Sequence, residues 1–217
     1  MNLSEALRTT GSTRAFTDDP IDDATVAAVL DDARFAPSGG NRQPWRVAVV
    51  KDLTIRRHLA DLMTAVWQEY LGETPSDPSR APFAFGRSVG AKPVAEPNSL
   101  LDDIERVPVV LSIAADLNKI ALMDGDAGRP PITGGASIYP FCWSILLAAR
   151  ERGLGGVLTT FLSRAEALAA PSLGLPPDHA IVATIFLGHP VHLNTRLRRQ
   201  PVSTFTTIDR FDGAPLT

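Results

Sequence analysis

The stretch from Ala36 to Trp45 reads APSGGNRQPW and separates a helix-like segment from the strand-like residues 46–50. Small residues at positions 38–40 allow a ligand to approach the backbone closely. Asn41 and Gln43 each offer one acceptor and two donors. Side chains that alternate along an extended segment point in different directions, so the two amides can bind a flat heterocycle and its side chain together. Taken alone, the same residues also suit an ordinary turn.

Three other segments extend this pattern along the chain. Residues 12–16 read STRAF, residues 153–160 form a Gly-rich turn that reads GLGGVLTT, and residues 188–201 contain GHP followed by RLRRQP. In this order and spacing, the four segments resemble the nitroreductase family of FMN-dependent oxidoreductases, over about residues 3–209. The resemblance implies an α+β fold with a mainly antiparallel sheet flanked by helices, assembled as an intertwined homodimer.

The resemblance also assigns residues to FMN. The phosphate favours guanidinium and hydroxyl groups, and the ribityl chain and flavin ring favour neutral hydrogen bonds, often supplied by the second subunit. The turn at 156–160 fits the place of a backbone donor near the flavin N5. The cofactor-binding set implied in this way is Ser12, Arg14, Pro37, Ser38, Gly39, Asn41, Gln43, Asn98, Gly156, Leu158, Thr159, Thr160, Arg198 and Arg199.

One position departs from the family pattern. The family carries a basic residue two positions before the serine of the N-terminal motif, whereas this chain has Thr10 there. One cation for the phosphate is therefore missing, and Arg8 and Arg198 are the replacements to consider. If the resemblance is set aside, residues 196–199 indicate a solvated basic tail. Gly153 and Gly155 then indicate only the end of a helix.

Composition is typical of a globular enzyme. The 217 residues are 44% hydrophobic and 21% charged, with a net charge of -3, which gives no case for a nucleic-acid partner. We expect a single nitroreductase-like domain over 1–217. The chain opens without a signal-peptide pattern and has no stretch long enough for a membrane span, so we expect a cytoplasmic location and no membrane partner. Cys142 is the only cysteine, and it lies in an apolar helix, which favours a buried, inert thiol.

Hydrophobic periodicity predicts the main elements. Helices are predicted at 3–7, 22–35, 53–71 and 136–152, with a short one at 117–123, and strands at 47–50, 107–115 and 181–187. Asn2 or Ser4 caps the first helix, and Asp22 or Asp23 the second. A capping box at 163–166 predicts the start of another helix. The broad apolar surface of 136–152 favours a dimer, and Trp45 is expected to pack in the core.

Two excursions are predicted, at 74–97 and 124–135, both rich in Pro and Gly. Long segments of this kind are often lids or binding loops. An arm around a partner subunit is the alternative interpretation of 74–97.

The expected reaction follows from the cofactor. FMN carries the redox chemistry, so no catalytic side chain is assigned. NADH or NADPH is expected as the donor, and a small, electron-poor aromatic such as a nitroaromatic or quinone as the acceptor, by a ping-pong mechanism. A deazaflavin in place of FMN stays open. The alternatives are a reductive dehalogenase or flavin-cleaving enzyme of the same superfamily, or a non-enzymatic flavin-binding dimer.

Other site chemistries find little support. His189 and His192 are three residues apart, but Gly188 and Pro190 break up the segment and no acid or cysteine completes a ligand set, so no metal site is predicted. No Gly-x-Gly-x-x-Gly follows a predicted strand, which argues against a Rossmann nucleotide site.

Overall fold

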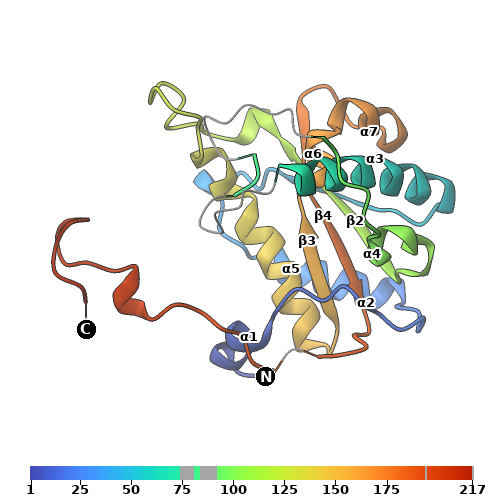
Figure 1. The fold of residues 1–217 in the computed structure, drawn as a ribbon, viewed down its shortest axis with the longest axis horizontal. Helices are drawn as coiled ribbons and strands as arrows, with labels where there is room; N and C mark the ends of the chain where they lie inside the picture. The colour runs from blue at the N-terminus through green and yellow to red at the C-terminus, as the bar shows by residue number, and fades with distance from the viewer. Residues whose placement is uncertain (74–80, 84–91, 194, 217) are drawn as a thin grey trace.

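The computed structural model describes residues 1–73, 81–83, 92–193 and 195–216. Its helices and its strands alternate along the chain (Figure 1). The α-helices are α1 (Leu3–Thr9), α2 (Asp23–Ala33), α3 (Leu53–Gly72), α4 (Ser99–Asp102), α5 (Tyr139–Glu151), α6 (Phe161–Arg164) and α7 (Glu166–Leu173). The strands are β1 (Trp45–Val49), β2 (Val109–Asp116), β3 (Gly155–Thr159) and β4 (His179–Gly188). Short 3₁₀ helices are η1 (Gly39–Asn41), η2 (Ile104–Arg106), η3 (Leu117–Lys119), η4 (Thr133–Ser137) and η5 (Val202–Thr204).

The four strands form one sheet in the order β1-β2-β4-β3, and every neighbouring pair is antiparallel. The predicted α+β fold with a mainly antiparallel sheet is therefore confirmed. β2 and β4 occupy the centre, and β1 and β3 form the two edges. One rung crosses the whole sheet, from Ala48 through Ser112 and Thr184 to Thr159.

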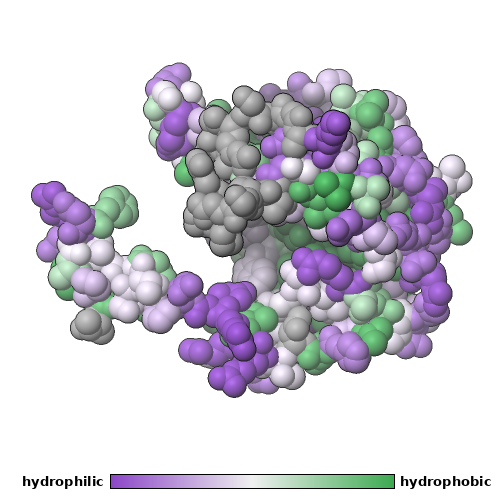
Figure 2. All heavy atoms as spheres, in the orientation of Figure 1, coloured by the Kyte–Doolittle hydropathy of each residue, from purple (hydrophilic) through white to green (hydrophobic). Residues whose placement is uncertain are grey.

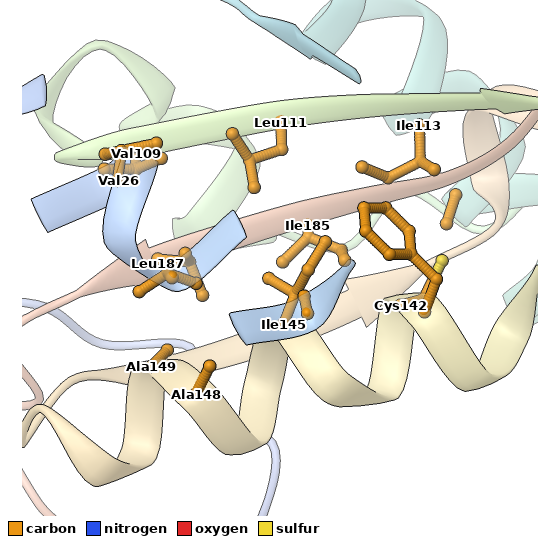
Figure 3. Close-up of a cluster of buried hydrophobic side chains, with 14 of the residues drawn as sticks. Val26, Val109, Leu111, Ile113, Cys142, Ile145, Ala148, Ala149, Ile185 and Leu187 are labelled. Atoms are coloured by element: carbon orange, nitrogen blue, oxygen red, sulfur yellow. The ribbon is translucent and has the colours of Figure 1, made fainter. Parts of the chain in front are cut away.

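Helices cover both faces of the sheet (Figure 1). On one face, α2 and α5 pack against alternate residues of the central strands, among them Leu111, Ile113 and Ile185 (Figure 3). On the other face, α3, α4, α6 and α7 enclose a second cluster that includes Val110 and Phe186. The period of two along each strand sends successive side chains to opposite faces, so both faces of β2 and β4 are apolar.

Several local predictions hold. Asn2 and Asp22 cap α1 and α2 as predicted, each accepting a hydrogen bond from a backbone N–H in the first turn. Asp52 caps α3 in the same way, which was not predicted. Trp45 stacks on Phe141 with ring centroids 4.6 Å apart, so the predicted packing against the core is confirmed. Cys142 is fully buried, and this burial raises the pKa of its thiol to about 12, as expected for an unreactive cysteine.

Other predictions are wrong. The Gly-rich turn at 153–160 contains edge strand β3. A helix, α7, does begin at Glu166, where the capping box predicted one. The box itself does not form, because Ser163 lies inside α6 and the Glu166 carboxylate accepts a hydrogen bond from Ile181 N at 2.5 Å instead. The predicted helix at 117–123 is limited to η3. The 74–97 excursion stays a prediction, because most of it, residues 74–80 and 84–91, lies outside the described residues.

The 124–135 excursion is an ordered loop built around one carboxylate. Asp124 accepts hydrogen bonds from the Thr133 hydroxyl at 2.5 Å, from Ile132 N at 2.9 Å and from Arg129 Nη1 at 2.7 Å. These bonds hold the pKa of Asp124 well below its usual range, the Thr133 hydroxyl contributing most. The loop leads directly into η4, whose last residue, Ser137, contacts a segment of the candidate site described below.

We predict that Arg56→Met lowers the free energy of unfolding by about 3 kcal/mol, because several buried carbonyls lose a charged donor. Arg56 is 6% exposed and donates to the carbonyl oxygens of Val50 and Val107, both at 2.7 Å. Urea unfolding measures the change. Arg57→Met is the control, since Arg57 forms an exposed ion pair with Glu105. Equal effects of the two substitutions would contradict a special role for Arg56.

Candidate functional site

A cavity of about 510 Å³ opens where the end of β3 meets the start of α4 and the last turns of α3. We call it the β3 cavity. It brings together five residues, from three distant parts of the sequence, that sequence analysis assigned to a cofactor. These residues are Arg14, Asn98, Leu158, Thr159 and Thr160.

The STRAF segment reaches this cavity because it runs beside β3. Thr13 N donates to the Gly156 carbonyl at 2.9 Å, and Ser12 forms an isolated parallel bridge with Gly156. Thr13 is buried against Gly155. A Cβ on residue 155 would lie only 2.7 Å from the Thr13 hydroxyl, so this close packing requires a glycine there. Alternation along the extended segment turns Ser12 and Arg14 outward, and both are exposed.

Two residues that line the β3 cavity carry buried polar atoms that lack partners. The Thr159 hydroxyl and the Trp67 indole Nε1 are shielded from solvent, and neither has a hydrogen-bond partner in the parts of the chain that the structure describes. Buried polar groups are rarely left unpaired, so these two atoms are exceptions among the side chains that line the cavity.

The residues of the β3 cavity fit FMN. The volume lies within the range of small-molecule sites, roughly 300–1,000 Å³. An exposed guanidinium at Arg14 suits a phosphate. The Asn98 amide, the unpaired Thr159 hydroxyl and the apolar Leu158 offer the mixture of contacts that a flavin ring and its ribityl chain need.

The amide segment, residues 37–43, folds into a tight loop before β1. The Ser38 hydroxyl accepts from Gln43 N at 3.0 Å, and Gln43 Nε2 donates to Asn41 Oδ1 at 3.2 Å. Gly40, Asn41 and Gln43 have φ values of 60°, 53° and 47°. This left-handed region is unfavourable for glutamine, and strain of this kind concentrates at functional sites.

The amide segment and the β3 cavity lie at opposite edges of the sheet. The amide segment precedes β1, whereas Thr159 ends β3, three strand spacings or about 14 Å away across the sheet. On the rung that joins the two edges, Thr159 corresponds to Ala48, five residues beyond Gln43. Pro37, Ser38, Gly39, Asn41 and Gln43 are therefore not brought into the β3 cavity of their own chain.

The predicted basic residues near the C-terminus lie apart from the cavity as well. Arg198 and Arg199 are exposed on an extended arm, residues 195–216, and the contact that the structure gives between them is a hydrogen bond from Arg199 Nη1 to the Arg198 carbonyl at 2.7 Å. Thr10 is buried, and its hydroxyl has no partner among the described residues.

Sequence analysis missed an aromatic wall of the β3 cavity. Trp67 and Tyr70 reach it from α3, and Phe161 from the start of α6. The signals were present, since Trp67 and Tyr70 are three apart on a helix and Phe161 directly follows the GVLTT sequence. Of the three, only Tyr70 entered the apolar periodicity that predicts the helix at 53–71.

In the ranges 1–73, 81–83, 92–193 and 195–216, no group of three or more His, Cys, Asp or Glu side chains could hold a metal ion. Nor does any helix of these ranges combine the length and apolar character needed to cross a bilayer.

Comparison with known proteins identifies the scaffold. Residues 7–189 match the sequence profile of the Nitroreductase family. The chain belongs to the nitroreductase family. This result confirms the resemblance seen in the four sequence segments.

Individual relatives cover most of the chain. A 5,6-dimethylbenzimidazole synthase from Rhodospirillum rubrum is 30% identical over 177 residues, covering 82% of this chain and 76% of that protein. A nitrobenzene nitroreductase from Ectopseudomonas oleovorans is 25% identical over 204 residues, covering 86% of each chain. The structure of an NADPH:FMN oxidoreductase from Vibrio harveyi in complex with NAD+ has a TM-score of 0.68 at 20% identity, covering 96% of this chain and 77% of that one. The last comparison shows a shared fold.

We predict that Ser137→Ala loosens the amide segment. Gly39 N donates to the Ser137 hydroxyl at 3.0 Å, across 98 residues of sequence, so removal of the hydroxyl leaves this amide exposed to water. Hydrogen exchange at Gly39 is expected to accelerate about tenfold, corresponding to the loss of one hydrogen bond. Ser137→Thr keeps the hydroxyl and is the control. Unchanged exchange in Ser137→Ala would show that the contact does not order the segment.

Proposed function

We propose that this nitroreductase-family chain is an FMN-dependent oxidoreductase that uses NADH or NADPH to reduce small, electron-poor aromatics. The observation that carries the proposal is the β3 cavity, whose lining brings together Arg14, Asn98 and residues 158–160. FMN, when bound, supplies the hydride chemistry. The protein itself binds and orients the cofactor and the substrate, and it excludes water from the site.

Each side chain has a role that follows from its chemistry. Arg14 neutralises the phosphate through charge-assisted hydrogen bonds. Asn98 and Thr159 hold neutral polar groups of the cofactor. Leu158 and the aromatic wall supply the apolar surface on which a flat ring stacks, and they keep bulk water from the reacting face.

We further propose that the chain is one FMN-binding domain that acts as a homodimer. The amide segment cannot join the β3 cavity of its own chain, because the two lie at opposite sheet edges, but it can join that of a second copy. The C-terminal arm supports this assembly, since it stands clear of the body (Figure 2) with Phe205 69% and Phe211 107% exposed. Exposed apolar side chains on an extended segment are typical of an arm that packs on a partner.

We predict that the protein, saturated with FMN, is bleached by NADH or NADPH and then reoxidised by nitrobenzene, with parallel lines in a double-reciprocal plot. Arg14→Ala is expected to weaken FMN binding roughly ten- to hundredfold, because a charge-assisted contact to the phosphate is lost. Equilibrium dialysis measures the affinity. The control is Arg34→Ala, which removes an exposed arginine paired with Asp31 on α2. Bound FMN that neither nicotinamide reduces would contradict the proposed donor and favour a non-enzymatic role or another reductant.

We predict that the cofactor site is shared between subunits. Dimers purified through two different tags would combine an Arg14→Ala chain with an Asn41→Ala chain. If the two residues meet across the interface, one site carries both lesions and the other is intact, so half of the sites should bind FMN with normal affinity. Reduced affinity at both sites, each with a single lesion, would instead place both residues in one chain.

A second candidate is the formation of 5,6-dimethylbenzimidazole, the product in the name of the Rhodospirillum rubrum relative. The observation that favours it is the identity of 30% over 82% of this chain. Mass spectrometry of a reaction with FMN, NADH or NADPH and oxygen distinguishes the two candidates. Accumulation of this product without added aromatic acceptor would support the second.

A further inference from the structure

Arg150, in the last turn of α5, is a buried cation without a counter-ion in the part of the chain that the structure describes. The residue is 7% exposed, and its Nε donates to the Thr9 hydroxyl at 3.3 Å. No carboxylate of the described residues lies within 4.0 Å of its guanidinium, and the adjacent acid, Glu151, pairs with the N-terminal ammonium at 2.9 Å. The partial negative charge at the end of a helix favours a cation there but does not neutralise it.

The second buried arginine, Arg56, shows how this protein satisfies a guanidinium for the sake of the fold. Arg56 donates to two backbone carbonyls at 2.7 Å, so its donors are used within the chain. The two Nη nitrogens of Arg150 have no such partner among the described residues, but both keep contact with solvent, whereas the neighbouring Thr10 hydroxyl is sealed. Burial of a charge is costly unless the charge is paired and hydrogen-bonded, so the open donors of Arg150 suit an anion from solution.

Arg150 lines a small cavity between α1, the end of α5 and the start of β3. We call it the α5 cavity, and its lining includes Thr9, Thr10, Gly11 and Leu193. Its volume of about 10 Å³ accommodates one water-sized atom. A single oxygen of a larger anion therefore fits inside, while the rest of that anion stays at the opening.

The α5 cavity and the β3 cavity lie along one strand. Gly155 and Gly156 line the first, and Leu158 and Thr159 line the second. The rise of about 3.4 Å per residue separates them by about 10 Å along β3. The exposed Ser12 lies between them, because it bridges to Gly156. A flat ring in the β3 cavity that carries an anionic group on a flexible chain can therefore reach both.

We propose that Arg150 binds the phosphate of the flavin cofactor at the opening of the α5 cavity. FMN has the required form, because its ribityl chain joins a flat ring to a phosphate monoester. The Nη nitrogens of Arg150 donate to phosphate oxygens in charge-assisted hydrogen bonds. The inference rests on the proposed function, since it assigns the cofactor of that reaction a second cation beside Arg14. This cation also compensates for the one missing at Thr10, which lines the same cavity.

The first test compares FMN with riboflavin, which has the same ring and ribityl chain but no phosphate. Quenching of flavin fluorescence measures both affinities on the full-length, flavin-free protein, without any nicotinamide. Arg150→Met is expected to weaken FMN binding about ten- to hundredfold and to leave riboflavin binding unchanged. Arg152→Met is the matched control at the same end of α5, because Arg152 already pairs with Asp32 at 2.8 Å. An equal loss for both flavins, or an unchanged preference for FMN, would overturn the proposal.

The second test asks whether Arg150 serves the fold instead. The flavin-free Arg150→Met variant is expected to unfold at the same or a higher urea concentration than the wild type, because a buried charge without a counter-ion is removed. Inorganic phosphate should raise the melting temperature of the wild type more than that of the variant, since only the wild type keeps the site. Lower stability of the flavin-free variant, with an equal response to phosphate, would show a structural role and contradict the proposal.

A further variant keeps the inference testable if methionine at this position prevents folding. Arg150→Lys retains the positive charge but replaces the planar guanidinium by a single ammonium. It should preserve part of the preference for FMN over riboflavin. A folded Arg150→Lys protein that prefers FMN as strongly as the Arg152→Met control, and gains equal stability from phosphate, would count against a bond from the guanidinium.

The comparison of the two flavins also separates the phosphate site from the reaction. A preference for FMN that depends on Arg150, in protein that neither nicotinamide reduces, would leave the phosphate site standing while the proposed reaction fails. Equal binding of FMN and riboflavin by the wild type would leave a flavin site and overturn the role of Arg150. Binding of neither flavin would overturn both.

Discussion

The antiparallel pairing of β2 with β4 at the centre of the sheet is the constraint on which the other features depend. Both strands are apolar on both faces, so helices must cover each side of the sheet. Once β2 and β4 are central, β1 and β3 become the edges. The amide segment and the β3 cavity, which adjoin these edges, are thereby held apart within one chain.

The sequence predicted the central elements well, for a physical reason. β2 and β4 are continuous apolar runs, and α5 is a long apolar helix, so their patterns are strong. β3 was missed because it begins with Gly155 and Gly156, which look like a turn but are required by contacts with Thr13 and Leu187. The capping box failed because Glu166 bonds to the start of β4, a tertiary contact that no local pattern contains.

The candidate site was predictable in its parts and not in its arrangement. The motifs named Arg14, Asn98 and residues 158–160, and the fold brings these together. The order of the motifs along the chain contains no information on the order of the strands in the sheet. The separation of Asn41 and Gln43 from the cavity residues therefore became visible only in the sheet topology. Arg199 lies on the arm, and the aromatic wall was hidden within an ordinary helical pattern.

The left-handed backbone of Asn41 and Gln43 has a consequence for how this protein responds to mutation. Each residue occupies a conformation that glycine adopts at lower cost, so a selection for thermal stability alone would favour glycine at both positions. Such variants would lose the two amide side chains while the fold gained stability. Laboratory evolution toward heat resistance should therefore erode this loop early, unless the screen also retains whatever the amides bind.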